Sequence, residues 1–205
     1  RDPEMSRGLG DVYKRQHTHR PTGKALEPSF AGIHPWQAET RRIEEIVPRF
    51  GEVDLVGEIG LDYAGTVGRE AQLRIFREQL DWAERLGKPV VLHCVKAFEA
   101  VMRELAPHAL RAVIFHGFIG SSQQAAEAIK KGYYLSFGER TFRSPRTVEA
   151  LRRTPVENLF AETDESDVPI EEIYRRIAQA KDLDPELLKC CLLYTSPSPR
   201  DISGS

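Results

Sequence analysis

The sequence predicts an α/β fold of the TIM-like (β/α) barrel class. Short apolar runs alternate with helical patterns along the chain, with no two strands in succession and no detectable repeat. Polar residues end at least five of the predicted strands. An open doubly wound sheet gathers ligands at one switch point, whereas a closed barrel brings many strand ends around one centre. These strand-end residues are His17 with His19, Glu58, His93, His116 and Asp164.

The predicted strands are short and apolar, and seven are recognisable rather than eight. A missing or distorted unit near the N-terminus is therefore expected. The strands are expected at 17–19, 29–33, 53–58, 88–94, 112–115, 133–137 and 159–162.

Helices are predicted between these strands from apolar residues at helical spacing. One helix is predicted at 69–86, and Gly87 directly after it is expected to end it. Ser121 or Ser122 can cap one helix, and Ser144 begins another. Pro48 suggests a kink or an early end in the helix predicted at 38–50. The remaining helices are expected at 97–105, 145–153 and 170–181.

The segment from Gly57 to Tyr63 closes an apolar run that starts at Val53 and predicts a buried strand ending at a turn. Glu58 would lie at the exit of this strand. A carboxylate is rare there unless it is paired or holds a metal. A salt bridge from Glu58 to an arginine, with Gly60 only turning the chain, is the alternative.

Composition restricts the function. The 205 residues are 40% hydrophobic and 29% charged, which is ordinary for a soluble globular protein. The net charge of -2 argues against a protein that coats duplex nucleic acid, but not against an enzyme acting on phosphodiesters. No apolar stretch reaches membrane-spanning length and no signal-peptide pattern is present, so we expect a cytoplasmic protein without membrane contact.

Three segments are predicted along the chain. Residues 1–16 and 190–205 resemble translated sequencing-adapter sequence, although native disordered tails would have a similar composition. Residues 17–189 are expected to form the barrel. Cys94 is the only cysteine well inside that segment, which fits a reducing compartment.

Four histidines and two carboxylates form the candidate metal-ligand set. His17 and His19 are two apart and would point to one side of a strand. Such a mixed set suits two open catalytic ions and tolerates Zn, Mn, Fe or Mg. Two ions can lower the pKa of a bridging water and polarise a phosphoryl or carbonyl oxygen. His34 is expected to be structural, packed beside Trp36, and His108 has no partner pattern.

The chain resembles the TatD family of metal-dependent deoxyribonucleases, within the amidohydrolase-like metallohydrolase barrels, in a short form. The matching motifs run in order from His17 to about Lys189. They are His17-Thr18-His19, Gly32-Ile33-His34-Pro35-Trp36, the segment from Gly57 to Tyr63, Leu92-His93-Cys94, His116-Gly117-Phe118-Ile119-Gly120, Ser136-Phe137-Gly138 and Glu162-Thr163-Asp164.

The resemblance implies a role for each ligand. His17, His19 and Asp164 would hold one divalent ion, and Asp164 would also orient or deprotonate the attacking water. His93 and His116 would hold the other ion, with Glu58 bridging the two. The implied reaction is hydrolysis of a DNA phosphodiester, typically from a 3′ end of a single strand, without an obligate protein partner.

Four further residues are candidates for substrate binding. Asp62 would position a ligand or loop, or serve only as a turn residue. Val95 replaces an arginine that the family often carries, and Lys96 beside it could contact phosphate or be solvated. Arg140 and Arg143 are phosphate-clamp candidates, and a solvated loop explains them nearly as well.

Two other functions stay open at this point. A related barrel amidohydrolase would use the same ligands on an amide, ester or lactone. An inactive truncated scaffold would bind less than one ion per chain.

Overall fold

The computed structural model describes residues 29–164, 166–186 and 188. They belong to two compact units, residues 29–116 and residues 117–188. The strand predicted at 17–19 and the terminal segments 1–16 and 190–205 lie outside the described residues.

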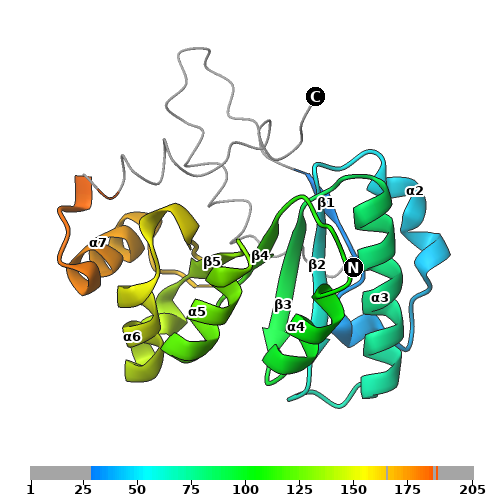
Figure 1. Cartoon of the computed structure of the whole chain (residues 1–205), viewed down its shortest axis with the longest axis horizontal. Coiled ribbons are helices and arrows are strands. Elements are labelled where there is room, and N and C mark those ends of the chain that lie inside the picture. Colours follow the sequence, from blue (N-terminus) through cyan, green and yellow to red (C-terminus); the bar gives the residue numbers. More distant parts are fainter. Residues whose placement is uncertain (1–28, 165, 187, 189–205) are drawn as a thin grey trace, which may run out of the picture. The chain divides into compact units, whose positions relative to one another are not determined.

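The first unit contains four parallel strands that pair in chain order. They are β1 (Phe30–Ala31), β2 (Leu55–Asp62), β3 (Val90–Val95) and β4 (Val113–Phe115). Helix α3 (Arg69–Arg85) packs against β2, and α4 (Phe98–Leu105) packs against β2 and β3, as Figure 1 shows. Gly87 follows α3 with φ +60°, the left-handed conformation that ends a helix.

Strand β2 is longer than predicted. It continues to Asp62, so Glu58 lies within the strand rather than at its exit. Gly60 pairs with His93 and Asp62 with Val95, and the register shifts between Val56 and Ile59. The strand continues because β3 supplies hydrogen-bonding partners past Glu58, a contact between distant residues that the local sequence does not reveal.

The continuous helix predicted at 38–50 is wrong. The chain instead forms two 3₁₀ turns, η1 (Pro35–Gln37) and η2 (Ile43–Glu45), followed by the short helix α2 (Val47–Phe50). Pro48 lies in the first turn of α2. Proline lacks an N–H and collides with the carbonyl four residues earlier, so a helix restarts there instead of passing through.

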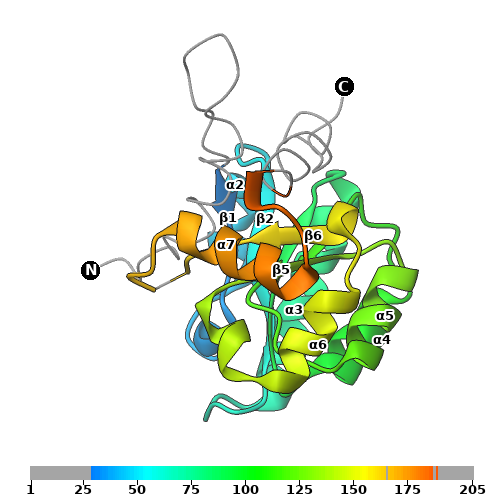
Figure 2. The same ribbon diagram turned by 90° about the vertical axis from the view of Figure 1, so that its left-hand side faces the viewer.

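The second unit contains two parallel strands, β5 (Tyr134–Phe137) and β6 (Leu159–Ala161). Helix α5 (Ser122–Lys130) packs against β5, α7 (Ile170–Lys181) packs against β6, and α6 (Pro145–Arg153) packs against both of these helices (Figure 2). The 3₁₀ turns η3 (Glu139–Arg143) and η4 (Val156–Asn158) complete the described elements. Ser121 and Ser144 accept hydrogen bonds from the backbone N–H groups of Gln124 and Thr147, which confirms both predicted caps.

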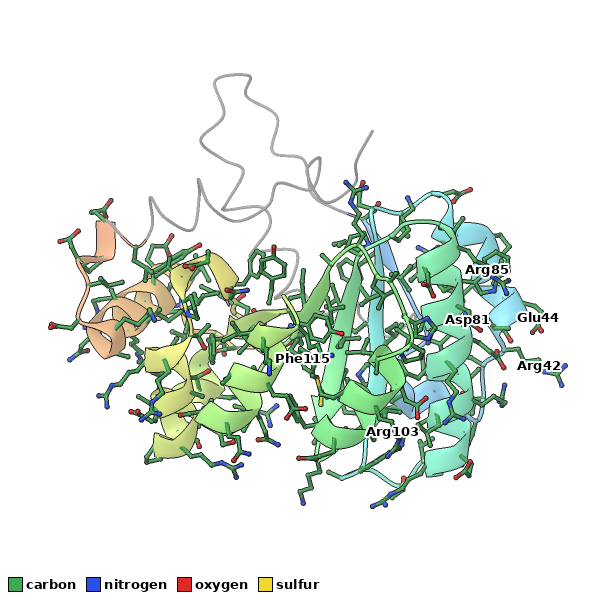
Figure 3. The ribbon with its side chains drawn as sticks, in the orientation of Figure 1. Arg42, Glu44, Asp81, Arg85, Arg103 and Phe115 are labelled. Atoms are coloured by element: carbon green, nitrogen blue, oxygen red, sulfur yellow. The ribbon has the colours of Figure 1, made fainter. Side chains whose placement is uncertain are left out.

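The faces of the helices divide by polarity. Asp81 and Arg85 on α3 and Arg103 on α4 are exposed, whereas Phe115 on β4 is buried (Figure 3). Among the described residues, no helix combines the length and apolar character needed to cross a bilayer.

Candidate metal centre

Glu58 faces two imidazole rings within the first unit. Its Oε2 lies 4.0 Å from Nδ1 of His93, and its Oε1 lies 3.8 Å from Nε2 of His116. The three side chains are 10%, 17% and 6% exposed. Each carboxylate oxygen therefore faces a different ring nitrogen in a largely buried setting.

These separations fit a shared cation better than direct hydrogen bonds. Both exceed the range of a hydrogen bond between nitrogen and oxygen. Histidine and carboxylate ligands lie about 2.0–2.2 Å from an ion such as Zn²⁺, so two ligands of one ion can be up to about 4.4 Å apart. The donor set of imidazole nitrogen and carboxylate oxygen also suits a divalent metal.

His34 belongs to the same cluster. Ligand atoms of His34, Glu58 and His93 all lie within 4.8 Å of one another. The backbone N–H of Trp36 donates to Nδ1 of His34 at 3.3 Å, which fixes the ring. Burial, with help from the neighbouring His93, lowers the pKa of His34 to about 4. The ring is therefore neutral near pH 7, the form that binds metals.

Asp62 organises the polar groups around His93. Its Oδ2 lies 3.2 Å from Nε2 of His93 and accepts the indole N–H of Trp36 at 2.8 Å. Its Oδ1 accepts the backbone N–H groups of Ala64 at 2.9 Å and Gly65 at 3.2 Å. Burial opposes ionisation of Asp62, but these hydrogen bonds outweigh it and lower the pKa of the carboxyl. Asp62 thus both caps a turn and orients a candidate ligand.

Two buried glutamines of α3 fix the backbone beneath the cluster. Gln79 accepts the N–H of Ile33 at 2.6 Å and donates to its carbonyl at 3.1 Å. Gln72 binds Asp62 in the same way, at 2.7 and 2.9 Å, and also donates to the carbonyl of Val67 at 2.9 Å. The residue before His34 and the Asp62 backbone are therefore both anchored to one helix.

The second unit holds Glu162 and Asp164 directly after β6. Glu162 is 1% exposed, accepts the backbone N–H of Gly117 at 3.2 Å and accepts a short hydrogen bond from the Ser136 hydroxyl. Asp164 is half-buried with φ +47°, a left-handed conformation that aspartate tolerates. The motif Glu162-Thr163-Asp164 thus presents one firmly held carboxylate and one in the turn that follows.

The predicted phosphate contacts are all on the surface. Lys96 is exposed with φ +51°, directly after β3. Arg140 and Arg143 are exposed on η3, and Arg143 pairs with Glu139 at 2.6 Å. Substrate contact by these three residues stays a prediction.

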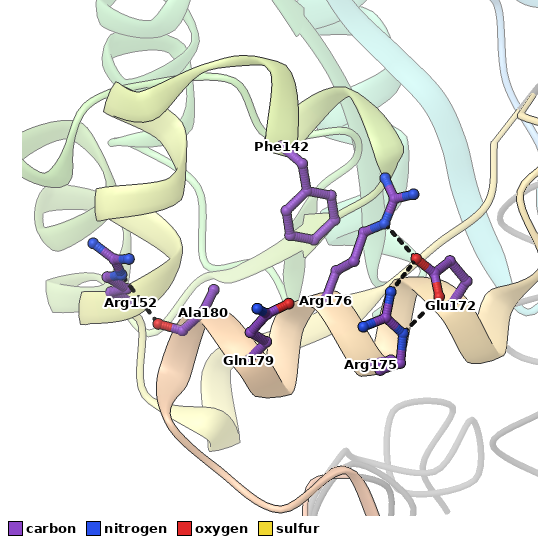
Figure 4. Close-up of a pocket in the computed structure, with 7 residues that line it drawn as sticks. All are labelled: Phe142, Arg152, Glu172, Arg175, Arg176, Gln179 and Ala180. Carbon is purple, nitrogen blue, oxygen red and sulfur yellow. Dashed lines mark hydrogen bonds and ion pairs between the residues drawn. The ribbon is translucent and has the colours of Figure 1, made fainter.

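A surface hollow of about 420 Å³ lies between η3, α6 and α7 (Figure 4). Arg175 and Arg176 both bind Glu172 there, at 2.6–2.7 Å, and lower the pKa of its carboxyl to about 2. None of the predicted site residues lines this hollow. The single carboxylate of Glu172 is therefore shared by two arginines.

Sequence reasoning brought Glu58, His93 and His116 into one site but left out His34, Gln72 and Gln79. The sequence held one signal for His34, which is its position at the end of a strand followed by Pro35. The glutamines left no such signal, because their partners are backbone groups. His17 and His19 lie outside the described residues.

Comparison with known proteins places these features in a family. The family model described as TatD related DNase matches residues 23–189. The putative deoxyribonuclease TATDN1 homolog of Encephalitozoon cuniculi is 32% identical over 188 residues, covering 86% of this chain and 67% of that protein. The 3′-5′ ssDNA/RNA exonuclease TatD of Citrobacter koseri is 33% identical over 149 residues, covering 66% and 56%. The chain spans 46–67% of the length of such curated relatives.

Solved structures agree on the fold. The crystal structure of the TatD homologue YjjV from Escherichia coli has a TM-score of 0.76 at 25% identity, covering 91% of this chain and 81% of that one. An uncharacterized amidohydrolase from Saccharomyces cerevisiae has a TM-score of 0.72 at 14% identity, covering 91% and 84%. The likeness confirms the predicted α/β barrel class.

Proposed function

The chain belongs to the TatD related DNase family of metal-dependent hydrolases, and on that premise we propose that it hydrolyses phosphodiester bonds of single-stranded DNA from a 3′ end. The observation that supports this most directly is Glu58, whose two oxygens face His93 and His116 at cation-sharing distances. A relative named as a 3′-5′ ssDNA/RNA exonuclease supports the substrate class.

We propose that Glu58 bridges two divalent ions, with His93 and His116 among the ligands of one. Bound divalent ions would supply Lewis acidity and lower the pKa of an attacking water. His34 lies close enough to Glu58 and His93 to join this set. A ligand set of nitrogen and oxygen atoms accepts zinc, magnesium, manganese or iron, so it does not choose among these ions.

The protein's own groups have separate tasks in this proposal. Asp62 holds His93 through Nε2, which leaves the Nδ1 lone pair toward Glu58. Asp164 would accept the proton of the attacking water and bind the other ion together with His17 and His19. Lys96, Arg140 and Arg143 would contact neighbouring phosphates of the strand.

A nuclease assay with matched variants tests the proposal. Purified protein is incubated with a 5′-labelled single-stranded oligonucleotide in Mg²⁺ or Mn²⁺, beside Glu58→Gln and the exposed-site control Glu44→Gln. We expect stepwise shortening from the 3′ end by the unsubstituted protein and by the control, and almost none by Glu58→Gln. Equal activity of Glu58→Gln would reject the mechanism.

A second set of substrates distinguishes a nuclease from an amidohydrolase. A panel of small esters, lactones and amides is offered to the same preparations with the same ions. Faster Glu58-dependent turnover of one of these than of DNA would reject the nuclease and favour an amidohydrolase. Less than one bound ion per chain after reconstitution would favour an inactive scaffold.

We also propose that the protein acts in the cytoplasm. Cys94 is a free thiol, and burial raises its pKa to about 12. An unpaired, unreactive cysteine is typical of proteins in a reducing compartment.

A further inference from the structure

Trp36 is an exposed aromatic residue next to the candidate metal ligands. Its exposed fraction is 62%, the largest among the exposed large hydrophobic residues of the described chain, ahead of Ile119 at 48% and Leu86 at 39%. Its ring centroid lies 4.6 Å from that of His34 and 5.9 Å from that of His93. The indole therefore stands at the edge of the cluster and not on an unrelated surface.

The indole is also held in place. Its N–H donates to Oδ2 of Asp62 at 2.8 Å, and Asp62 is 5% exposed. The backbone N–H of Trp36 binds the His34 ring, and Pro35 before it has a fixed φ. Contacts at both ends of the residue restrict its rotation while leaving most of the ring in contact with solvent.

Core packing does not explain this arrangement. Burial of a tryptophan is among the most favourable contributions to folding, and this one is largely unburied. A polar residue could satisfy Asp62 without exposing an indole. A fixed, solvent-facing aromatic ring beside a hydrolytic centre is what a nucleobase needs for stacking.

We propose that Trp36 stacks on a base of the bound strand and so positions the nucleotide next to the metal ligands. The inference rests on the proposed nuclease function and adds a base-recognition element to it. Stacking is tolerant of sequence because every base has a π-face. The residue would therefore favour strands that carry a base at this point, without choosing among the four bases.

A ratio of rates tests the inference. Two single-stranded oligonucleotides are compared, one complete and one with an abasic nucleotide at the last or the penultimate 3′ position. We expect the unsubstituted protein to prefer the complete strand by about 5- to 150-fold in kcat/KM, from the usual range of base stacking. Trp36→Ala should bring this ratio close to one, and Trp36→Phe should retain much of it.

The ratio isolates stacking from damage to the metal site. Loss of the hydrogen bond to Asp62 would lower both rates together and leave their ratio unchanged. A fall of both rates by the same factor in Trp36→Ala would therefore overturn the inference while the nuclease stands. If the unsubstituted protein cleaves neither strand, the proposed function fails and this inference fails with it.

Fluorescence supplies a readout that does not depend on turnover. The chain has two tryptophans, so Trp82→Phe leaves Trp36 as the only tryptophan, whose emission is read by excitation beyond the absorption of the tyrosines. Trp82 lies on α3 and is absent from the candidate centre. On rapid mixing, we expect the complete strand to quench the emission before cleavage and the abasic strand to quench it less. Unchanged emission during active cleavage would overturn the inference.

Discussion

Oδ2 of Asp62 lies 3.2 Å from Nε2 of His93, while Nδ1 of the same ring faces Glu58 at 4.0 Å. One imidazole thus stands between two carboxylates. Since the pKa of Asp62 is lowered, its carboxylate stays ionised and holds the proton on Nε2. The lone pair on Nδ1 is thereby directed at Glu58, the orientation that a metal ligand requires.

Asp62→Asn should weaken metal binding by about 10- to 100-fold, the usual effect of losing a carboxylate behind a histidine ligand. The asparagine oxygen can still accept the N–H groups of Ala64 and Gly65, which turns its amide N–H groups toward His93 and Trp36. Calorimetric titration with Mn²⁺ or Zn²⁺ measures the change. Asp81→Asn on the outward face of α3 is the matched control, and an equal effect of both would contradict the assignment.

His34→Gln should lower the thermal stabilisation that added metal produces. A ligand at 100 times its Kd stabilises a protein by about 2.7 kcal/mol, so weaker binding gives a smaller rise in Tm. Tm is measured in chelator and then in excess Mn²⁺ or Zn²⁺. His108→Gln is the control, because the His108 ring pairs with Glu84 at 2.7 Å. This variant should retain the full metal-dependent rise in Tm. Identical rises in both variants would exclude His34 as a ligand.

Gly60→Ala should strongly destabilise the first unit. A Cβ at Gly60 would lie 2.1 Å from the carbonyl oxygen of His93, and its φ of +139° disfavours any side chain. The change must push β2 away from β3, and we expect a loss of about 3 kcal/mol or more. Gly51→Ala is the control, because φ is -70° and no atom lies within 4 Å of the added Cβ. The unfolding midpoints of Gly60→Ala and Gly51→Ala are measured in denaturant. Equal midpoints would contradict this account.

Gln79→Leu should destabilise the protein by roughly 2–4 kcal/mol. The substitution leaves the buried N–H and carbonyl of Ile33 without their partners, at a cost of about 1–3 kcal/mol for each buried group. Glu70→Gln, at an exposed position of the same helix, should change stability by less than about 0.5 kcal/mol. Urea midpoints provide the comparison. A neutral Gln79→Leu would mean that water or repacking satisfies Ile33.

Lys181→Met should destabilise the second unit by about 1–3 kcal/mol. Nζ of Lys181 donates to the carbonyls of Leu151, Arg152 and Thr154 at 3.2, 3.1 and 2.5 Å, which joins α7 to the end of α6. Hydrogen exchange of the amides in α6 and α7 should increase. Lys131→Met, at an exposed position after α5, should leave the exchange of both helices as it was.

The sequence predicted best what depends on near neighbours. The caps at Ser121 and Ser144 follow from residues three positions away, and the alternation of strands and helices follows from local hydrophobic periods. The extent of β2 was misjudged because its last residues are held by β3, more than thirty positions along the chain. The segment before Gly51 was read as one helix from its apolar spacing, and the kink or early end expected at Pro48 did not foresee the two 3₁₀ turns that precede α2.

Prediction of the candidate site shows the same division. Glu58, His93 and His116 were grouped because each was predicted at the carboxyl end of a strand, and parallel strands align these ends. Their roles as ligands stay predictions. His34 was read as a packing residue because its contact with Trp36 is local, whereas its proximity to Glu58 exists only in three dimensions.

The candidate metal centre depends on the rotational phase of α3, because Gln72 and Gln79 on this helix hold the backbone at Asp62 and Ile33. Gln72 and Gln79 are seven residues apart, so about two turns place both amides on one side of the helix. One residue inserted between them would rotate the second amide by about 100° and carry it away from Ile33. The positions of His34 and Asp62 therefore depend on the length and phase of α3, which supplies none of the candidate ligands, and neither an insertion nor a deletion between the two glutamines should be tolerated.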